Sequence, residues 1–123
     1  MRSWFRVLKP GGRLLLNTCH PIAWCMQQQE GGSLRMPRSY VDESPDRVTF
    51  SGTDMAKRYG GWDQQHISVE FHRPISSILN AMLAAGFELL RVEEPAPPGG
   101  ASRLELPISL VVLARKPQGS PGG

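Results

Sequence analysis

Hydrophobic residues recur at helical spacing most clearly between Pro74 and Gly86. Five apolar positions in this segment follow the i, i+3, i+4, i+7, i+8 pattern that places side chains on one face of a helix. They are Ile75, Ile78, Leu79, Met82 and Leu83. Pro74 suits the first helical position and Gly86 suits the C-terminal cap. The pattern therefore predicts an amphipathic helix between these two residues.

Three short apolar runs predict strands. Residues 13–18 follow a Gly-Gly turn and are too few for a core helix, so they are expected to form a buried strand. Residues 87–94 alternate in part between apolar and polar positions and also predict a strand. The last run, residues 108–115, contains an unbroken apolar stretch at 110–114. Such a stretch indicates burial on both faces of a sheet, and hence a central strand.

The remaining pattern is weaker. Ser3 is expected to N-cap a short helix that Pro10 ends, and this helix is too short to persist alone. No clear periodicity survives from residue 20 to residue 65, where prolines and glycines interrupt the chain. We expect a long irregular insertion with a short helix around 22–28 and a short extended piece at 69–71. Loops of this length in compact domains are usually lids, binding loops or disordered segments.

Composition narrows the class of protein. A chain of 123 residues, 40% hydrophobic and 20% charged, suits a single domain with a packed core. The net charge of +3 is mild and the basic residues are scattered, which argues against a nucleic-acid partner. No apolar run approaches the roughly 20 residues of a membrane span, and no signal peptide is recognised at the N-terminus. A cytoplasmic location with two free cysteines is therefore expected.

Several motifs resemble one enzyme family. The string Val-Leu-Lys-Pro-Gly-Gly at 7–12, followed by an apolar strand, resembles the turn before the fifth strand of class I S-adenosylmethionine-dependent methyltransferases. Thr-Cys-His-Pro at 18–21 and Phe-His-Arg-Pro at 71–74 resemble segments of one branch of the methyltransferase type 11 domain group. The helix at 75–86 and the last two strands follow in the order of that branch. The resemblance covers the C-terminal half of the family's domain.

This resemblance implies an α/β fold, a partial Rossmann-like sheet whose last three strands lie in the order 5-7-6, with one long helix and an irregular insertion. Residues 1–117 would form the C-terminal part of the methyltransferase domain, with a lid-like insertion at 19–68, and 118–123 a disordered tail. The family builds its S-adenosylmethionine site upstream, on a Gly-x-Gly-x-Gly turn, and no Gly-x-Gly occurs here. We therefore expect S-adenosylmethionine in the complete family domain, but neither cofactor binding nor activity from this chain alone.

Two histidines are the candidate catalytic residues. His20 follows a predicted strand, where α/β sheets bind ligands, and a histidine there can orient a substrate or take a proton. The resemblance places His72 and Arg73 beside the substrate cleft, and a guanidinium can bind a carboxylate or phosphate through two hydrogen bonds. The structural alternative is that these side chains fix the loop or tie the insertion to the sheet.

Aromatic residues gather in the insertion. Trp24, Tyr40 and Trp62, together with Arg73, are the candidate substrate-binding residues, because an aromatic lid can enclose a small-molecule acceptor and exclude water. The alternative is that the aromatic side chains form a small core of the insertion itself. The sequence does not identify the methyl acceptor or its reacting atom.

Two other functions remain open. Cys19, Cys25, His66 and His72 form a possible zinc set, although the cysteine spacing is longer than the usual two to four intervening residues. The chain is alternatively a non-enzymatic α/β module that pairs with another chain through an exposed sheet edge. If the strand at 14–17 has no neighbour on one side, self-association through that edge is also expected.

Overall fold

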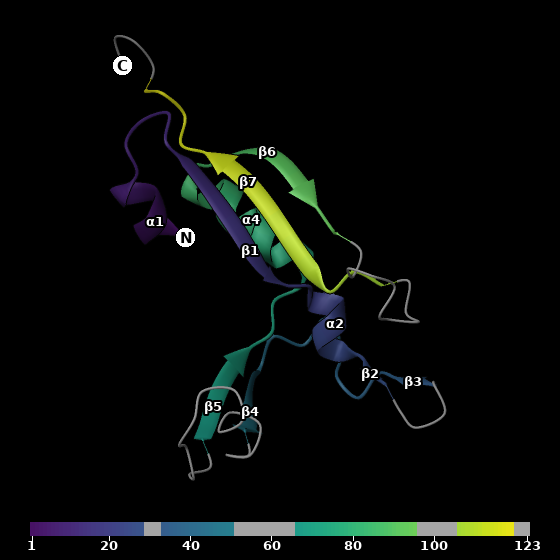
Figure 1. Ribbon diagram of the computed structural model, residues 1–123. Coiled ribbons are helices and arrows are strands. Elements are labelled where there is room, and N and C mark those ends of the chain that lie inside the picture. The colour runs from purple at the N-terminus through teal and green to yellow at the C-terminus, as the bar shows by residue number, and fades with distance from the viewer. Residues whose placement is uncertain (29–32, 51–65, 96–105, 120–123) are drawn as a thin grey trace, which may run out of the picture. The chain divides into compact units, whose positions relative to one another are not determined.

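The computed structural model describes residues 1–28, 33–50, 66–95 and 106–119 (Figure 1). The chain divides into two compact units, Met1–Val41 with Arg73–Gly123, and Asp42–His72. Each unit is described by itself below. In the described residues, no helix is both long and apolar enough to cross a membrane.

The larger unit contains a three-stranded antiparallel sheet. Its strands are β1 (Arg13–Cys19), β6 (Glu88–Glu93) and β7 (Ser109–Arg115), in the order β1-β7-β6. The last strand of the sequence is therefore central, as its apolar run predicts. Because β7 runs antiparallel to both neighbours, β1 and β6 point in the same direction (Figure 1). Their carboxyl ends consequently lie at the same edge of the sheet.

One face of this sheet carries the core. On β7, Leu110, Val112 and Ala114 are completely buried, and they form one cluster with Met82 and Phe87. The intervening residues of β7 are only half-buried. The expectation of burial on both faces is therefore met on one face only, because the second face is incompletely covered. The apolar run still reflects the central position of the strand.

Helix α4 (Ile75–Ala85) packs most of its predicted apolar face on the core cluster, but Leu83 is 53% exposed. It ends at Gly86, whose φ of 104° is the left-handed conformation of a C-terminal cap. Pro74 is the N-cap rather than the first helical residue, so the helix begins one position later than the sequence suggests. The Tyr40 hydroxyl accepts a hydrogen bond from the backbone N–H of Ile75 at 3.1 Å. This bond satisfies one of the free amides at the start of the helix.

Helix α1 (Arg2–Val7) begins two residues earlier than expected. Met1 is its N-cap and Ser3 lies inside the helix, so the predicted Ser3 cap was wrong. The Phe5 ring packs edge-on against Phe87 with 5.1 Å between centroids. Lys116 fixes the helix to the end of β7, because its Nζ donates to the carbonyl of Phe5 at 3.0 Å and to that of Leu8 at 2.9 Å.

The first part of the insertion is more regular than predicted. Helix α2 (Pro21–Cys25) replaces the helix expected around 22–28 and ends sooner. Two two-residue strands follow, β2 (Gln27–Gln28) and β3 (Leu34–Arg35), which pair antiparallel.

The smaller unit contains one antiparallel strand pair. Strand β4 (Pro45–Phe50) pairs with β5 (His66–Phe71), and Pro45 lies opposite Phe71 at one end of the register. The extended piece predicted at 69–71 is therefore the end of a longer strand. The sequence analysis did not predict β4, and it predicted only the end of β5. Strand β5 does alternate, with Ile67, Val69 and Phe71 separated by polar residues.

Candidate functional site

His20 stands directly after β1 and organises the turn into α2. Its backbone N–H donates to the carbonyl of Ile108 at 3.0 Å, which fastens the end of β1 to the chain entering β7. Its Nδ1 accepts a hydrogen bond from the backbone N–H of Ile22 at 3.1 Å and so N-caps the helix. The residue is 3% exposed. The structural role weighed for His20 in the sequence analysis is therefore observed.

The second ring nitrogen of His20 reaches across the sheet edge. Nε2 lies 2.5 Å from Oε2 of Glu94, which follows the last residue of β6. Because Nδ1 accepts a hydrogen bond, we infer that the ring proton is on Nε2 and that Nε2–H donates a hydrogen bond to the carboxylate. The neutral imidazole thus has a partner at each nitrogen. The side chain of Glu94, by contrast, is 49% exposed.

The position of this pair suits ligand binding. His20 and Glu94 follow the carboxyl ends of β1 and β6, two strands that run in the same direction. In open α/β sheets, ligands bind outside the carboxyl ends of parallel strands. Sequence reasoning missed Glu94, although an acidic residue at the end of a predicted strand is a signal that was available.

The arrangement determines which group can exchange protons with a ligand. A proton on Nδ1 of His20 would have to displace the N–H of Ile22, so the ring cannot act as a base while the cap is intact. The carboxylate of Glu94 is half-exposed, so it can take a proton without breaking the cap of α2. A carboxylate held in this way can accept a hydrogen bond or a proton from a bound molecule. His20 is accordingly a positioning residue for Glu94.

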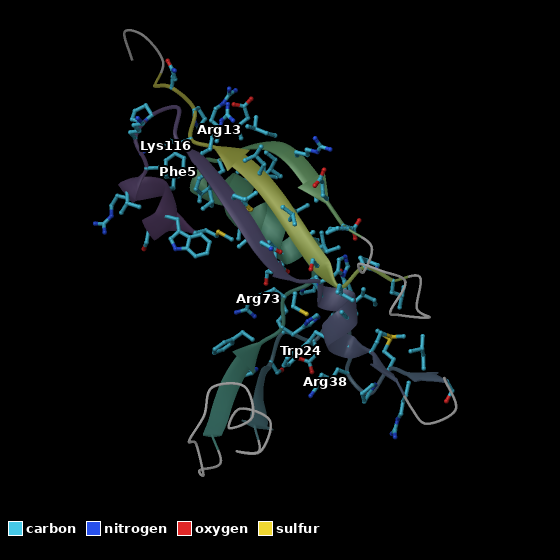
Figure 2. All side chains as sticks on the ribbon, viewed as in Figure 1. Phe5, Arg13, Trp24, Arg38, Arg73 and Lys116 are labelled. Carbon is cyan, nitrogen blue, oxygen red and sulfur yellow. The ribbon has the colours of Figure 1, made fainter. Side chains whose placement is uncertain are left out.

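Trp24 lies on α2, close to the positively charged Arg38 (Figure 2). The guanidinium carbon of Arg38 is 4.7 Å from the centre of the Trp24 ring, and Nη1 donates to the Trp24 carbonyl at 3.3 Å. The next residue, Cys25, is fully buried. Burial raises the pKa of the Cys25 thiol, and the charge of Arg38 opposes that rise. Trp24 thus has a packing partner, Arg38, within the insertion.

Of the other predicted site residues that the structure describes, Tyr40 and Arg73 belong to the larger unit and His72 to the smaller. Tyr40 caps α4 through its hydroxyl, so that group is already used. Arg73 is exposed just before α4 and belongs to the larger unit (Figure 2). His72 is buried and belongs to the smaller unit. Trp62 lies outside the described residues.

A hydrogen-bonded turn lies in the smaller unit with His72. Hydrogen bonds from the side chain and backbone of Ser44 lower the pKa of Asp42, and the backbone bond is 2.9 Å long. The charge of His72 acts in the same direction.

The zinc alternative receives no support from the described residues. Cys19 and Cys25 form no disulfide, and the first is exposed while the second is buried. Across the described ranges, no three histidine, cysteine or acidic side chains come together as metal ligands.

Comparisons with known proteins agree with the fold. No protein-family model matches the sequence, and no curated protein does. A solved structure of a putative S-adenosylmethionine-dependent methyltransferase from Listeria monocytogenes is similar, with a TM-score of 0.70 and 22% identity over 95% of this chain and 53% of that one. An S-adenosylmethionine-dependent methyltransferase from Mesorhizobium loti gives a TM-score of 0.62 and 29% identity over 93% of this chain and 52% of that one.

These likenesses confirm the resemblance to S-adenosylmethionine-dependent methyltransferases that the sequence motifs predict. The chain has the α/β fold of part of such a protein. It spans about half the length of the two methyltransferases that it matches.

Proposed function

We propose that this chain forms the substrate-side half of an S-adenosylmethionine-dependent methyltransferase that acts on a small-molecule acceptor. The observation that carries the proposal is the structural match, which takes in 95% of this chain but 53% of the Listeria monocytogenes protein. In this proposal β1, β6 and β7 correspond to the fifth, sixth and seventh strands of the family's sheet. Their observed order, β1-β7-β6, supports that correspondence.

The residues of this chain do not fit the cofactor by themselves. The sequence has no Gly-x-Gly, and the described part has no glycine-rich turn between a parallel strand and a helix. The cofactor site of the proposed enzyme would therefore be built by polypeptide beyond this half. In the assembled protein, bound S-adenosylmethionine supplies the methyl group.

Glu94 and His20 form the acceptor side of the proposed site. The half-exposed carboxylate of Glu94 accepts a hydrogen bond from a hydroxyl or amine of the acceptor and takes its proton. His20 positions that carboxylate through the hydrogen bond from Nε2. The hydrogen bond that caps α2 keeps the His20 ring in one orientation. The pair thus supplies orientation and a proton acceptor, the two demands of methyl transfer to a protic atom.

Photochemical crosslinking tests the proposed function. An affinity tag added after Gly123 in the source cells allows the native polypeptide, with any partner, to be isolated and irradiated with methyl-labelled S-adenosylmethionine. We expect labelling of the native assembly and none of the recombinant 123-residue chain. An unlabelled native assembly would refute the methyltransferase assignment. Stoichiometric micromolar binding by the recombinant chain would show that this half contains a complete cofactor site.

The alternative is a non-enzymatic module that pairs with another chain through β1. Among the described residues, β1 pairs only with β7, so its other edge is open. Open edges pair readily with further strands. A native assembly that contains a partner chain, yet neither binds nor consumes S-adenosylmethionine, would favour this alternative.

A further inference from the structure

Arg13, Arg115 and Glu88 form a row across the sheet, at the end opposite His20. Arg13 of β1 lies directly opposite Arg115 of β7, and Arg115 lies directly opposite Glu88 of β6. Like charges in directly opposed positions destabilise a strand pair. Arg13 is exposed and Arg115 is half-buried, so burial of their side chains does not explain why two like charges are placed opposite each other.

Within the described part of the chain, only one of the two guanidiniums, that of Arg115, is paired with a carboxylate. Oε2 of Glu88 accepts hydrogen bonds from Arg115, at 3.2 Å from Nε and 2.7 Å from Nη2. Arg13 forms no ion pair or hydrogen bond through its side chain with any residue that the structure describes. Arg115 is therefore held in place by Glu88, while the charge of Arg13 is left without compensation there.

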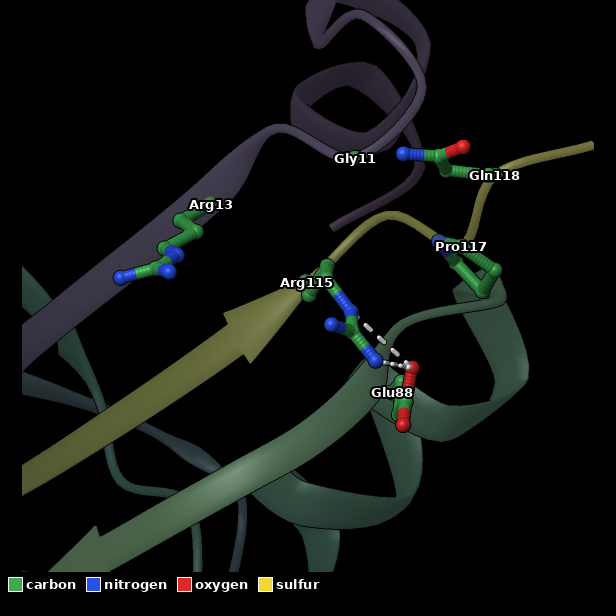
Figure 3. Close-up of a pocket in the computed structure, with 6 residues that line it drawn as sticks. All are labelled: Gly11, Arg13, Glu88, Arg115, Pro117 and Gln118. Carbon is green, nitrogen blue, oxygen red and sulfur yellow. Dashed lines mark hydrogen bonds and ion pairs between the residues drawn. The ribbon is translucent and has the colours of Figure 1, made fainter.

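A cavity of about 310 Å³ opens beside this row (Figure 3). It is lined by Gly11, Arg13, Glu88, Arg115, Pro117 and Gln118. Its volume is at the small end of the range for ligand pockets, which suits a compact ligand. Figure 3 shows the Arg115 guanidinium turned toward Glu88 and the Gln118 amide turned toward Gly11.

On one side of the cavity, Gly11 leaves space for the side-chain amide of Gln118, which is a hydrogen-bond donor. Gly11 has a φ of 78°, and its N–H donates to the carbonyl of Lys116 at 2.8 Å. A Cβ at this position would lie 3.3 Å from Nε2 of Gln118, so glycine leaves room for the amide. The Lys116 ammonium is already bound to the carbonyls of α1. The surplus positive charge at the cavity is thus that of the arginine pair.

We propose that this cavity binds the phosphoryl group of a small molecule. A guanidinium matches the oxygens of phosphate through paired hydrogen bonds. The exposed Arg13 side chain is turned away from Arg115 and Gln118 in Figure 3, so in this proposal it swings toward the anion when the anion binds. Its charge offsets the repulsion between Arg13 and Arg115. The site lies at the opposite ends of the strands from His20 and Glu94, so it is independent of the proposed methyl transfer.

Equilibrium dialysis tests this site on the full 123-residue chain. The probes are labelled orthophosphate, pyrophosphate and, as a carboxylate of similar charge, succinate. Arg13→Gln removes the uncompensated guanidinium. Arg91→Gln is the matched control, because it makes the same change of charge at an exposed residue that pairs with Glu93 instead. Arg13→Lys keeps the positive charge but removes the paired hydrogen-bond donors of the guanidinium. This variant replaces Arg13→Gln in the test if the glutamine variant fails to fold.

We expect saturable binding of one phosphate or pyrophosphate per chain. Arg13→Gln should weaken it about ten- to a hundredfold, the loss expected for a hydrogen bond between charged groups. Arg13→Lys should weaken it less, and Arg91→Gln should leave it within about twofold, a difference too small for loss of such a bond. Absence of saturable binding, equal losses in the Arg13 and Arg91 variants, or succinate binding as tightly as phosphate would each overturn the proposal.

Discussion

His20 and Glu94 are 74 residues apart in the sequence, yet Nε2 of one lies 2.5 Å from Oε2 of the other. This contact joins the carboxyl end of β1 to that of β6 across the intervening strand. The other nitrogen of the same ring caps α2. One buried imidazole therefore fixes two strand ends and a helix, and it leaves the carboxylate as the group that a ligand can reach.

Glu94→Gln should impair methyl transfer in the native assembly. The amide can still accept the hydrogen bond from His20 but cannot take a proton, so turnover should fall by roughly a hundredfold or more, the usual loss for a general base. Crosslinking of S-adenosylmethionine should persist. Glu93→Gln is the control, because Glu93 is a neighbouring carboxylate paired with Arg91. Equal turnover in the two variants would remove Glu94 from the proposed mechanism.

The two bonds of His20 can be separated by substitution. Asparagine is a good N-cap residue but is too short to reach Glu94, so His20→Asn should retain the α2 cap. His20→Ala should lose the cap and lower the free energy of unfolding by a further 0.5 to 2 kcal/mol, roughly the usual cost of losing such a cap. Urea denaturation followed by circular dichroism measures both. If the two variants unfold at the same urea concentration, the Nδ1 bond does not stabilise this turn.

Gly86→Ala should destabilise the larger unit. The φ of 104° is unfavourable for any residue with a Cβ, at a cost of about 1 to 2 kcal/mol. The added carbon would also stand 3.0 Å from the ring of Phe5, which itself packs on Phe87. Gly119→Ala is the matched control, since nothing lies within 4 Å of its added carbon. Thermal unfolding should separate the variants, and similar melting temperatures would contradict the strained cap.

Some of this architecture follows from the sequence because local pattern and burial coincide. The α4 spacing predicts its buried face, and the glycine at its end provides the left-handed cap. The apolar run of β7 predicts its central position. It overstates the burial, since Leu15 on the neighbouring strand, opposite Leu113, is 66% exposed. The apolar run of a strand thus predicts its position in the sheet more reliably than the burial of each of its faces.

Other features depend on contacts that no local pattern encodes. The pairing of β4 with β5 is one of them, because a proline at the start of β4 weakens its signal as a strand, although β5 itself alternates between polar and apolar residues. Ser3 has the chemistry of a cap, but the N-cap is Met1, two residues earlier, and Ser3 lies inside the helix. Glu94 acquires its candidate role only because the sheet brings it to His20. The site was therefore half predicted, through the histidine alone.

The two cysteines should differ in reactivity toward iodoacetamide. The thiolate is the reactive form, and burial raises the pKa of Cys25 while Cys19 is exposed. At neutral pH Cys19 should therefore be alkylated first, and Cys25 labelling should increase as the pH rises. Arg38→Gln should slow Cys25 further, because it removes the charge that opposes the raised pKa. Peptide mass spectrometry gives both rates, and equal rates in the folded chain would show that Cys25 is accessible.

The open edge of β1 leads to the last prediction, which concerns self-association. Alternate side chains of β1 point away from the core face, and one of them, Leu15, is 66% exposed. Backbone donors and acceptors on the open side lie beside this apolar surface, so the edge is a template for another copy of the chain. We expect the recombinant chain to form oligomers, which sedimentation velocity measures. Leu15→Lys should shift it toward the monomer, because a charge on an edge strand opposes strand pairing.

A control separates edge pairing from the general effect of added charge. Val7→Lys makes the same change of charge at a residue of α1 that is 74% exposed and away from the strand edge. It should sediment like the unmodified chain. If both lysine variants dissociate the oligomer equally, net charge rather than the edge governs association. If the unmodified chain sediments as a single, cooperatively folded monomer, the β1 edge does not pair with a second copy, because the exposed leucine and the open backbone are then tolerated in water.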